Sequence, residues 1–431
     1  MVLGWVERAT GQLNSVALVQ IFLSWGAFAF FAIALTKALG LQRRMALMIV
    51  AIGCLEPLGY YWSRAFMSDS PAQSAFVFLC GVLLLRCHAA LRFGLVFIAG
   101  FVLLSLRTVY FPAVLLALLA TAAWSAWSGR KQAFASEARV RPASERHPAR
   151  SWGLAAAAFL CADLTYAAVN TLATRSHTFS ANVGDMEFLA GALSPLGGDQ
   201  LESTPLTAAE RAALVPLTYE NRNAQLFNSN GLVPLIRGHY KSVEAARPAM
   251  RRFVVNVVVH HPVRLAGLVV RQWSEYLNPV LVWSYHRKGW WSGAVAYGQP
   301  NDLPESVIQV FRDWKVWPTP TADLPARNSP SLWYFKRAGG VWSFVLALYA
   351  ALSFLAIFLV PRSYRAGFLV FSTVFSLLYM AEIALAADEL VTRYLLPISA
   401  PLLYMVAIAI HAGCGRARET APARSSAAAA A

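Results

Sequence analysis

The stretch from Phe93 to Ser128 reads FGLVFIAGFVLLSLRTVYFPAVLLALLATAAWSAWS, and its only charged residue is Arg107. A run of about 20 apolar residues is long enough to cross the hydrocarbon core of a bilayer as a helix. Arg107 and Pro112 divide the stretch into two apolar runs, 93–110 and 112–128. The stretch therefore predicts two membrane helices joined by a very short turn.

Similar apolar runs recur along the whole chain, separated by short charged loops. The sequence is 57% hydrophobic and only 14% charged, with a mean hydropathy of +0.48, whereas soluble domains carry about 25% charged residues. The strict alternation of β-barrel strands is missing. We expect an all-α polytopic membrane protein with about nine transmembrane helices, near 16–41, 45–62, 72–88, 93–110, 112–128, 152–173, 339–361, 366–387 and 394–413.

One long polar segment interrupts this series and divides the chain. We expect an N-terminal membrane bundle at 1–174, a soluble segment of mixed structure at 175–336, C-terminal membrane helices at 337–413 and a disordered tail at 414–431. Within the soluble segment, Thr207 followed by Glu210 predicts a capping box at a helix start, and Pro262 predicts a break between two helices. Residues 277–335, rich in Pro, Gly and Trp, are expected to be irregular.

The basic residues predict the orientation of the chain. They cluster in alternate loops, at Arg43 and Arg44, Arg86 and Arg92, 130–150, Arg362 and Arg365, and after Gly413. Such loops face the cytoplasm, so the segment 175–336 is expected outside and the C-terminus inside a bacterial inner membrane. The net charge of +15 then reads as a topology signal, and no nucleic-acid partner is expected.

Neither the cysteines nor the histidines have metal-site spacing. The five cysteines lie in or beside apolar runs and form no CxxC motif. His260 and His261 are adjacent, so on a helix they point to different faces, which favours a structural role. We therefore expect no metal site and no disulfide framework.

Ionisable residues at membrane depth mark functional sites, because inserting one costs about 2.5–3.5 kcal/mol at a helix centre. Glu56, Arg107, Asp163 and Glu382 lie at such depth, and Arg64, Asp69, Asp388, Glu389 and Arg393 lie near the outer boundary. On the expected topology most of them gather toward the outer face, where arginines and carboxylates would suit an anionic headgroup. Structural roles compete: Arg64 and Arg393 can snorkel, and Asp69 can cap a helix.

Three short motifs resemble those of the polyprenyl-phosphate-sugar-dependent glycosyltransferases of the GT-C class, which include protein O-mannosyltransferases and the lipid A aminoarabinose transferase. The run from Leu55 to Ser70 resembles their "P…Y-S-R…D/E" segment, Ser105 to Pro112 resembles "L-x-R/K…P", and Thr392 to Pro397 resembles "R-Y-L-L-P". The stretch from Phe253 to Pro279 is similar to the helix that precedes the last spans of that family.

The resemblance implies a lipid-phosphate sugar donor and a set of binding residues. Asp69 matches the second acidic motif, Arg107 the basic residue at an outer helix end, and Arg393 the late arginine. The substrate-binding candidates are therefore Arg64, Asp69, Arg107, Glu382 and Arg393, with Asp69 the best candidate for the catalytic carboxylate. The family's first span and first outer loop have no counterpart here, so we expect them to be encoded upstream of Met1.

The function expected is transfer of a sugar from a polyprenyl phosphate to a glycan, lipid or protein acceptor at the outer face of the membrane. A divalent cation would suit a phosphosugar, but nothing in the sequence requires one. The alternative is a non-catalytic protein that binds lipid-linked sugars or scaffolds the assembly of envelope glycans. A transporter is a third reading, which the absence of an internal sequence repeat disfavours.

Overall fold

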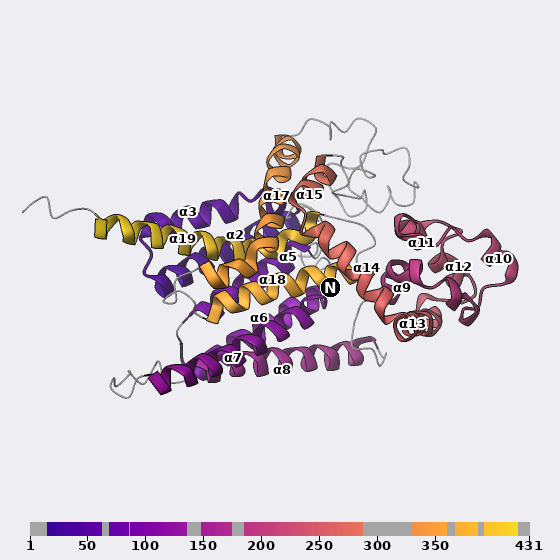
Figure 1. The fold of residues 1–431 in the computed structure, drawn as a ribbon, viewed down its shortest axis with the longest axis horizontal. Helices are drawn as coiled ribbons and strands as arrows, with labels where there is room; N and C mark the ends of the chain where they lie inside the picture. The colour runs from indigo at the N-terminus through magenta and orange to yellow at the C-terminus, as the bar shows by residue number, and fades with distance from the viewer. Residues whose placement is uncertain are drawn as a thin grey trace, which may run out of the picture.

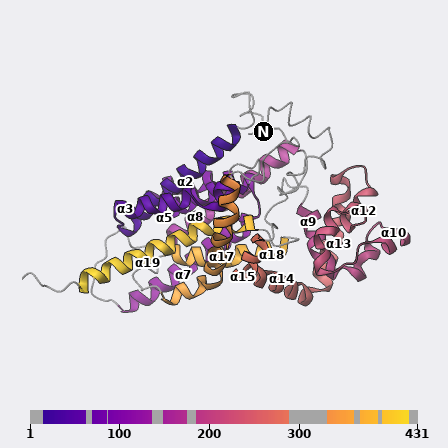
Figure 2. The same cartoon turned by 90° about the horizontal axis from the view of Figure 1, so that it is seen from above.

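The computed structural model describes residues 15–62, 69–85, 87–135, 148–174, 185–287, 330–359, 367–386 and 392–420. Within these ranges the chain is helical and contains no strand. The helices form a long bundle with a smaller group of helices at one end (Figures 1 and 2). The bundle consists of α2 (Ser15–Leu39), α3 (Arg43–Cys54), α4 (Pro57–Trp62), α5 (Asp69–Leu84), α6 (Ala89–Leu106), α7 (Tyr110–Ala135), α8 (Pro148–Thr174), α17 (Pro330–Leu359), α18 (Gly367–Ala386), the 3-10 helix η8 (Thr392–Ile398) and α19 (Ser399–Thr420).

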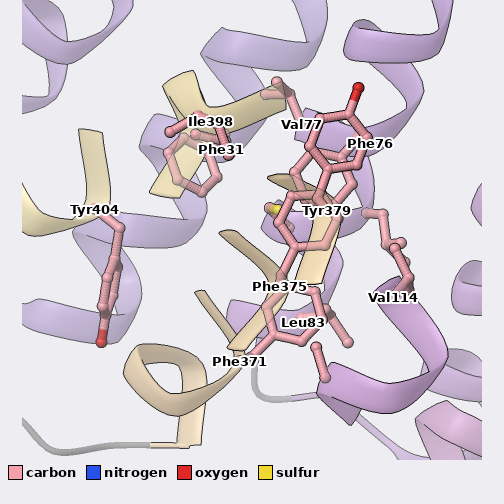
Figure 3. Close-up of a cluster of buried hydrophobic side chains, with 14 of the residues drawn as sticks. Phe31, Phe76, Val77, Leu83, Val114, Phe371, Phe375, Tyr379, Ile398 and Tyr404 are labelled. Atoms are coloured by element: carbon pink, nitrogen blue, oxygen red, sulfur yellow. The ribbon is translucent and has the colours of Figure 1, made fainter. Parts of the chain in front are cut away.

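The bundle brings the two halves of the membrane sequence together. Helix α5 packs against α2 and α6, and α18, from the C-terminal half, packs against α7. Aromatic side chains fill the space between them (Figure 3): the rings of Phe76 and Phe375 are stacked with centroids 4.2 Å apart, and Tyr379 stacks on Phe375 at 5.4 Å. Each such ring removes a large apolar area from contact with lipid or water and adds a favourable ring–ring contact.

Seven helices among the described residues are long and apolar enough to cross a membrane, or up to eight if one bent pair counts as a single span. The sequence predicted about nine. Two of the expected spans differ: 45–62 is α3 and α4, interrupted at Glu56, and 72–88 is α5, a shorter apolar helix of 16 residues. Pro57 cannot donate a backbone hydrogen bond, which explains the interruption. The count of nine stays a prediction.

The smaller group of helices, which we call the helical domain, comprises α9 to α13 and has its own apolar core. Its elements are α9 (Asp185–Leu193), η2 (Ser194–Leu196), η3 (Gly198–Ser203), α10 (Ala208–Ala213), η4 (Tyr219–Asn221), α11 (Arg222–Phe227), α12 (Leu232–Gly238) and α13 (Val243–His260). The capping box expected at Thr207 is present, with Glu210 as its partner. Leu385 of α18 packs against this core, so the domain sits at one end of the bundle.

Two further helices return the chain to the bundle. Helix α14 (Pro262–Tyr276) meets α13 at 98°, which confirms the break expected at Pro262, and it packs against α18. Helix α15 (Pro279–Arg287) packs against α17.

The structure corrects three expectations about this region and the tail. The described part of 175–336 is helical rather than mixed. The described ends of the expected irregular stretch 277–335 are helical, at 279–287 and again from Pro330, whereas residues 288–329 lie outside the described residues. Helix α19 also continues past the expected boundary at 413 as far as Thr420.

Candidate functional site

Arg107 and Asp69 form an ion pair where two antiparallel helices meet. Arg107 follows the last residue of α6; its backbone is extended, with φ −152° and ψ 104°, while its N–H still donates to the carbonyl of Leu103. Asp69 is the first residue of α5. The Arg107 Nη2 and Asp69 Oδ2 atoms lie 2.6 Å apart, without the alignment of a hydrogen bond. The side chain of Asp69 is 7% exposed and that of Arg107 is 26% exposed, so part of the arginine side chain remains accessible.

A small, open pocket lies beside this pair. Its wall is completed by the turn before α7 and by residues from α7, α18 and η8, namely Val109, Tyr110, Tyr379, Leu396 and Pro397. The tight turn between α6 and α7 therefore brings Arg107 and Tyr110 to one face of the pocket. The late segment 392–398 forms another face, although it lies at the far end of the sequence.

Two tyrosines form the base of the pocket. The rings of Tyr110 and Tyr379 have centroids 5.3 Å apart, and their hydroxyl groups share a hydrogen bond. The stacked rings of Phe76 and Phe375 continue this aromatic cluster: both lie next to Tyr110, and Phe375 also stacks on Tyr379. Figure 3 shows Phe76, Phe375 and Tyr379. The pocket thus combines a cation, a carboxylate and phenolic hydroxyls above an apolar aromatic layer. Such a surface can bind an anionic or sugar-like headgroup while its base packs against apolar matter.

Glu382 lies one helical turn beyond Tyr379 on α18. Its carboxylate accepts a hydrogen bond from the backbone N–H of Ala113, in the first turn of α7. A carboxylate at the first turn of a helix satisfies an otherwise unpaired N–H and interacts favourably with the helix dipole. Glu382 is therefore next to the pocket but absent from its lining, and its contact is with the backbone of α7.

The structure brings together only part of the residue set expected from the sequence. Asp69 and Arg107 converge, and Arg393 belongs to the same 3-10 helix as the pocket residues Leu396 and Pro397. The side chain of Arg393 lies outside the described part, as do Arg64, Asp388 and Glu389. Asp163 lies within α8 and does not line the pocket.

Glu56 is buried, with an exposed fraction of 1%, and so is Gln73 on α5. The Gln73 amide donates to Glu56 at 3.0 Å and to the carbonyl of Leu396 at 3.3 Å. Sequence reasoning singled out Glu56 but missed Gln73, Tyr110 and Tyr379. A neutral polar side chain in an apolar run gives little signal, because glutamine and tyrosine occur at many structural positions.

The two adjacent histidines at the bend between α13 and α14 have different partners. His261 Nε2 lies 2.9 Å from both carboxylate oxygens of Asp199, whereas His260 Nδ1 lies 2.8 Å from the carbonyl of Asn256. The hydrogen bond with His261 lowers the pKa of Asp199 below its usual range. The contact between His261 and Asp199 holds the bend between α13 and α14 against η3. Among the described residues, no group of three or more His, Cys, Asp or Glu side chains is placed to hold a metal ion.

The apolar helices, their length and the aromatic interior define the class: this is an all-α, multi-pass membrane protein. No family model, curated protein or solved structure matches the chain.

Proposed function

We propose that the protein is a membrane glycosyltransferase that takes its sugar from a polyprenyl phosphate at the outer face of a bacterial inner membrane. The supporting observation is the pocket in which the partly accessible Arg107 stands beside the buried Asp69. An arginine binds phosphate oxygens with directed, charge-assisted hydrogen bonds. The apolar surroundings of the pocket suit a ligand whose remainder is a lipid.

In this proposal the acceptor hydroxyl attacks the anomeric carbon of the donor sugar. A new carbon–oxygen bond forms as the bond between the anomeric carbon and the phosphate oxygen breaks. The acceptor proton passes to a carboxylate, for which Asp69 is the candidate, and polyprenyl phosphate leaves. Arg107 then stabilises the negative charge that develops on the leaving phosphate. Tyr110 and Tyr379 supply hydroxyl groups at the base of the pocket for sugar or phosphate oxygens.

A non-catalytic binder of lipid-linked sugars is the second candidate, and one observation favours it. Among the described residues that line the pocket, Asp69 is the only one with a carboxylate, and it is engaged with Arg107. A carboxylate that is held by a cation is a weaker base than a free one. This second protein would bind the same headgroup through Arg107 without transferring the sugar.

The test uses the full chain in nanodiscs with a radiolabelled polyprenyl-phosphate sugar. Binding of the donor and release of polyprenyl phosphate in the presence of membrane extract are measured separately. Arg107→Ala is expected to lose both. Arg92→Ala is the matched control: Arg92 is also largely buried and lies near the opposite end of α6, about 22 Å along the helix axis. Binding without release would favour the second candidate, and no binding at all would reject both.

A further inference from the structure

The pocket wall formed by η8 depends on a buried contact that the proposed chemistry does not use. Glu56 lies between α3 and α4, at the break in the chain, and is 1% exposed. A carboxyl group buried in an apolar interior is costly unless it is hydrogen-bonded. Its presence at this position therefore points to a contact with a specific role.

That contact is the side-chain amide of Gln73. The Nε2 atom of Gln73 lies 3.0 Å from Glu56 Oε2 and 3.3 Å from the carbonyl oxygen of Leu396. An amide group has two N–H donors, so a single Gln73 can serve both acceptors. Gln73 therefore joins three segments that are remote in sequence: the break before α4, helix α5 and η8.

The position of Gln73 relates this contact to the pocket. Residues four apart in a helix lie on the same side, one turn from each other, and Gln73 follows Asp69 by four positions in α5. Leu396, whose carbonyl Gln73 holds, is itself part of the pocket lining. Asp69 therefore lines the pocket from one side of α5. One turn further along the same side, Gln73 holds η8, which forms another part of the pocket wall.

Neighbouring side chains closely surround the contact between Glu56 and Gln73. Ser399, the first residue of α19, and Trp342 of α17 lie next to the same carboxyl group. A Cβ atom at Gly59 would lie 3.2 Å from Gln73 Oε1 and 3.5 Å from Glu56 Oε2. The glycine on α4 therefore gives the amide and the carboxyl group the room to meet.

We propose that Glu56 and Gln73 are a positioning pair that holds η8 in place as one wall of the Asp69–Arg107 pocket. The pair does not touch the ligand; it acts through the carbonyl of Leu396. The identity of the ligand as a polyprenyl phosphate rests on the proposed function, whereas the positioning of η8 does not.

The first experiment requires no ligand. Hydrogen exchange of the full chain in nanodiscs is followed by mass spectrometry for the peptide that contains η8. In Glu56→Leu/Gln73→Leu, exchange in η8 is expected to become about five- to tenfold faster, the effect of losing one hydrogen bond. The double variant leaves neither a buried carboxyl group nor an unpaired amide at this contact, so it is expected to fold. Glu56→Gln keeps an acceptor for Gln73 and is expected to exchange like the wild type.

Thr121→Val is the control for buried polar groups in general. Thr121 is fully buried, and its hydroxyl donates to the carbonyl of Ala117 within α7, away from η8. Its loss should leave exchange in η8 unchanged. Unchanged exchange of η8 in the double variant would overturn the proposal. Collapse of the whole double variant would also count against it, because the pair would then be a requirement of the bundle and not of one wall.

The second experiment links the wall to the pocket. Binding of undecaprenyl monophosphate, at a defined mole fraction in phosphatidylcholine nanodiscs, is measured for the same variants. The double variant is expected to bind about tenfold more weakly, with a thermal midpoint close to that of Thr121→Val. Glu56→Gln should restore wild-type binding. If exchange in η8 becomes faster but binding is unchanged, the pair does not act on the pocket. A wild-type chain that does not bind would count against the proposed function, while exchange alone decides the positioning of η8.

Discussion

The guanidinium of Arg107 lies 2.6 Å from the carboxylate of Asp69 because α6 ends where α5 begins. The two helices are antiparallel neighbours, so the end of one is brought beside the start of the other. Tyr110, at the start of α7, and Tyr379, from α18, complete the surroundings of the pair.

Removing one partner of this ion pair should lower the stability of the protein more than removing both partners does. Arg107→Met leaves Asp69 largely buried without its cation, whereas Asp69→Asn/Arg107→Met leaves no charge to compensate. We expect the double variant to be more stable than Arg107→Met alone. Because the Arg107 side chain is 26% exposed, the coupling should be modest, about 1–2 kcal/mol. Thermal midpoints of the single and double variants in one detergent measure it, and strictly additive losses would contradict the prediction.

A methyl group at Gly231 should destabilise the helical domain. Its Cβ would lie 2.3 Å from the carbonyl oxygen of Ala224 and 2.8 Å from that of Gln225, and backbone atoms cannot rotate away. Overpacking of this kind costs about 1–3 kcal/mol. Gly238→Ala, at the other end of α12, is the matched control, because no atom lies within 4 Å of a Cβ there. Limited proteolysis of the full chain should cut Gly231→Ala sooner than Gly238→Ala; equal rates would speak against the close approach.

His286 should make the contact between α15 and α17 sensitive to acid. Its ring is buried against Phe335, and its Nε2 atom lies 3.1 Å from the Phe335 carbonyl. Burial lowers the pKa of His286 from 6.5 to about 4. Since the folded pKa lies below the unfolded one, the neutral ring contributes stability above about pH 6.5, and this is lost as the pH falls toward 4, by at most about 3 kcal/mol.

The measurement compares the thermal midpoint of the wild type with that of His286→Gln between pH 7.5 and 4.5. Hydrogen bonds lower the pKa values of other groups, among them Asp199 and Glu210, so the stability that these carboxylates contribute starts to fall only toward the acid end of this range. Subtracting the thermal midpoint of the variant from that of the wild type at each pH removes the contribution of these groups. The wild type should lose more stability than the variant on acidification, and parallel curves would show that His286 is not responsible.

The orientation expected from the basic loops can be tested with single cysteines. Ser229 is exposed in the helical domain, and Ser426 lies in the C-terminal tail. In a background without the native cysteines, Ser229→Cys should react with an impermeant maleimide in intact cells, whereas Ser426→Cys should react only after permeabilisation. The reverse pattern would place the pocket end of the bundle inside and would remove the basis for an outer-face reaction.

The sequence by itself determined the class of fold. Long apolar runs and sparse charges leave a helix as the structure that satisfies every backbone group within a single segment. Local chemistry also determined two features that the structure confirms: the capping box at Thr207 and the bend at Pro262. Both depend on residues that are neighbours in sequence, so no knowledge of distant contacts was needed.

Only the tertiary structure decided which polar residues belong together. The sequence named Asp69, Arg107 and Glu382 together as substrate-binding candidates, because each is an ionisable residue at membrane depth or near the outer boundary. Packing of α5 against α6 pairs the first two, while Glu382 is directed to the backbone of α7. Hydropathy reports how deep a residue lies but carries no information about which face of its helix meets which neighbour. That choice is made by side-chain packing between helices, which is also what brings Gln73 to Leu396 across the length of the chain.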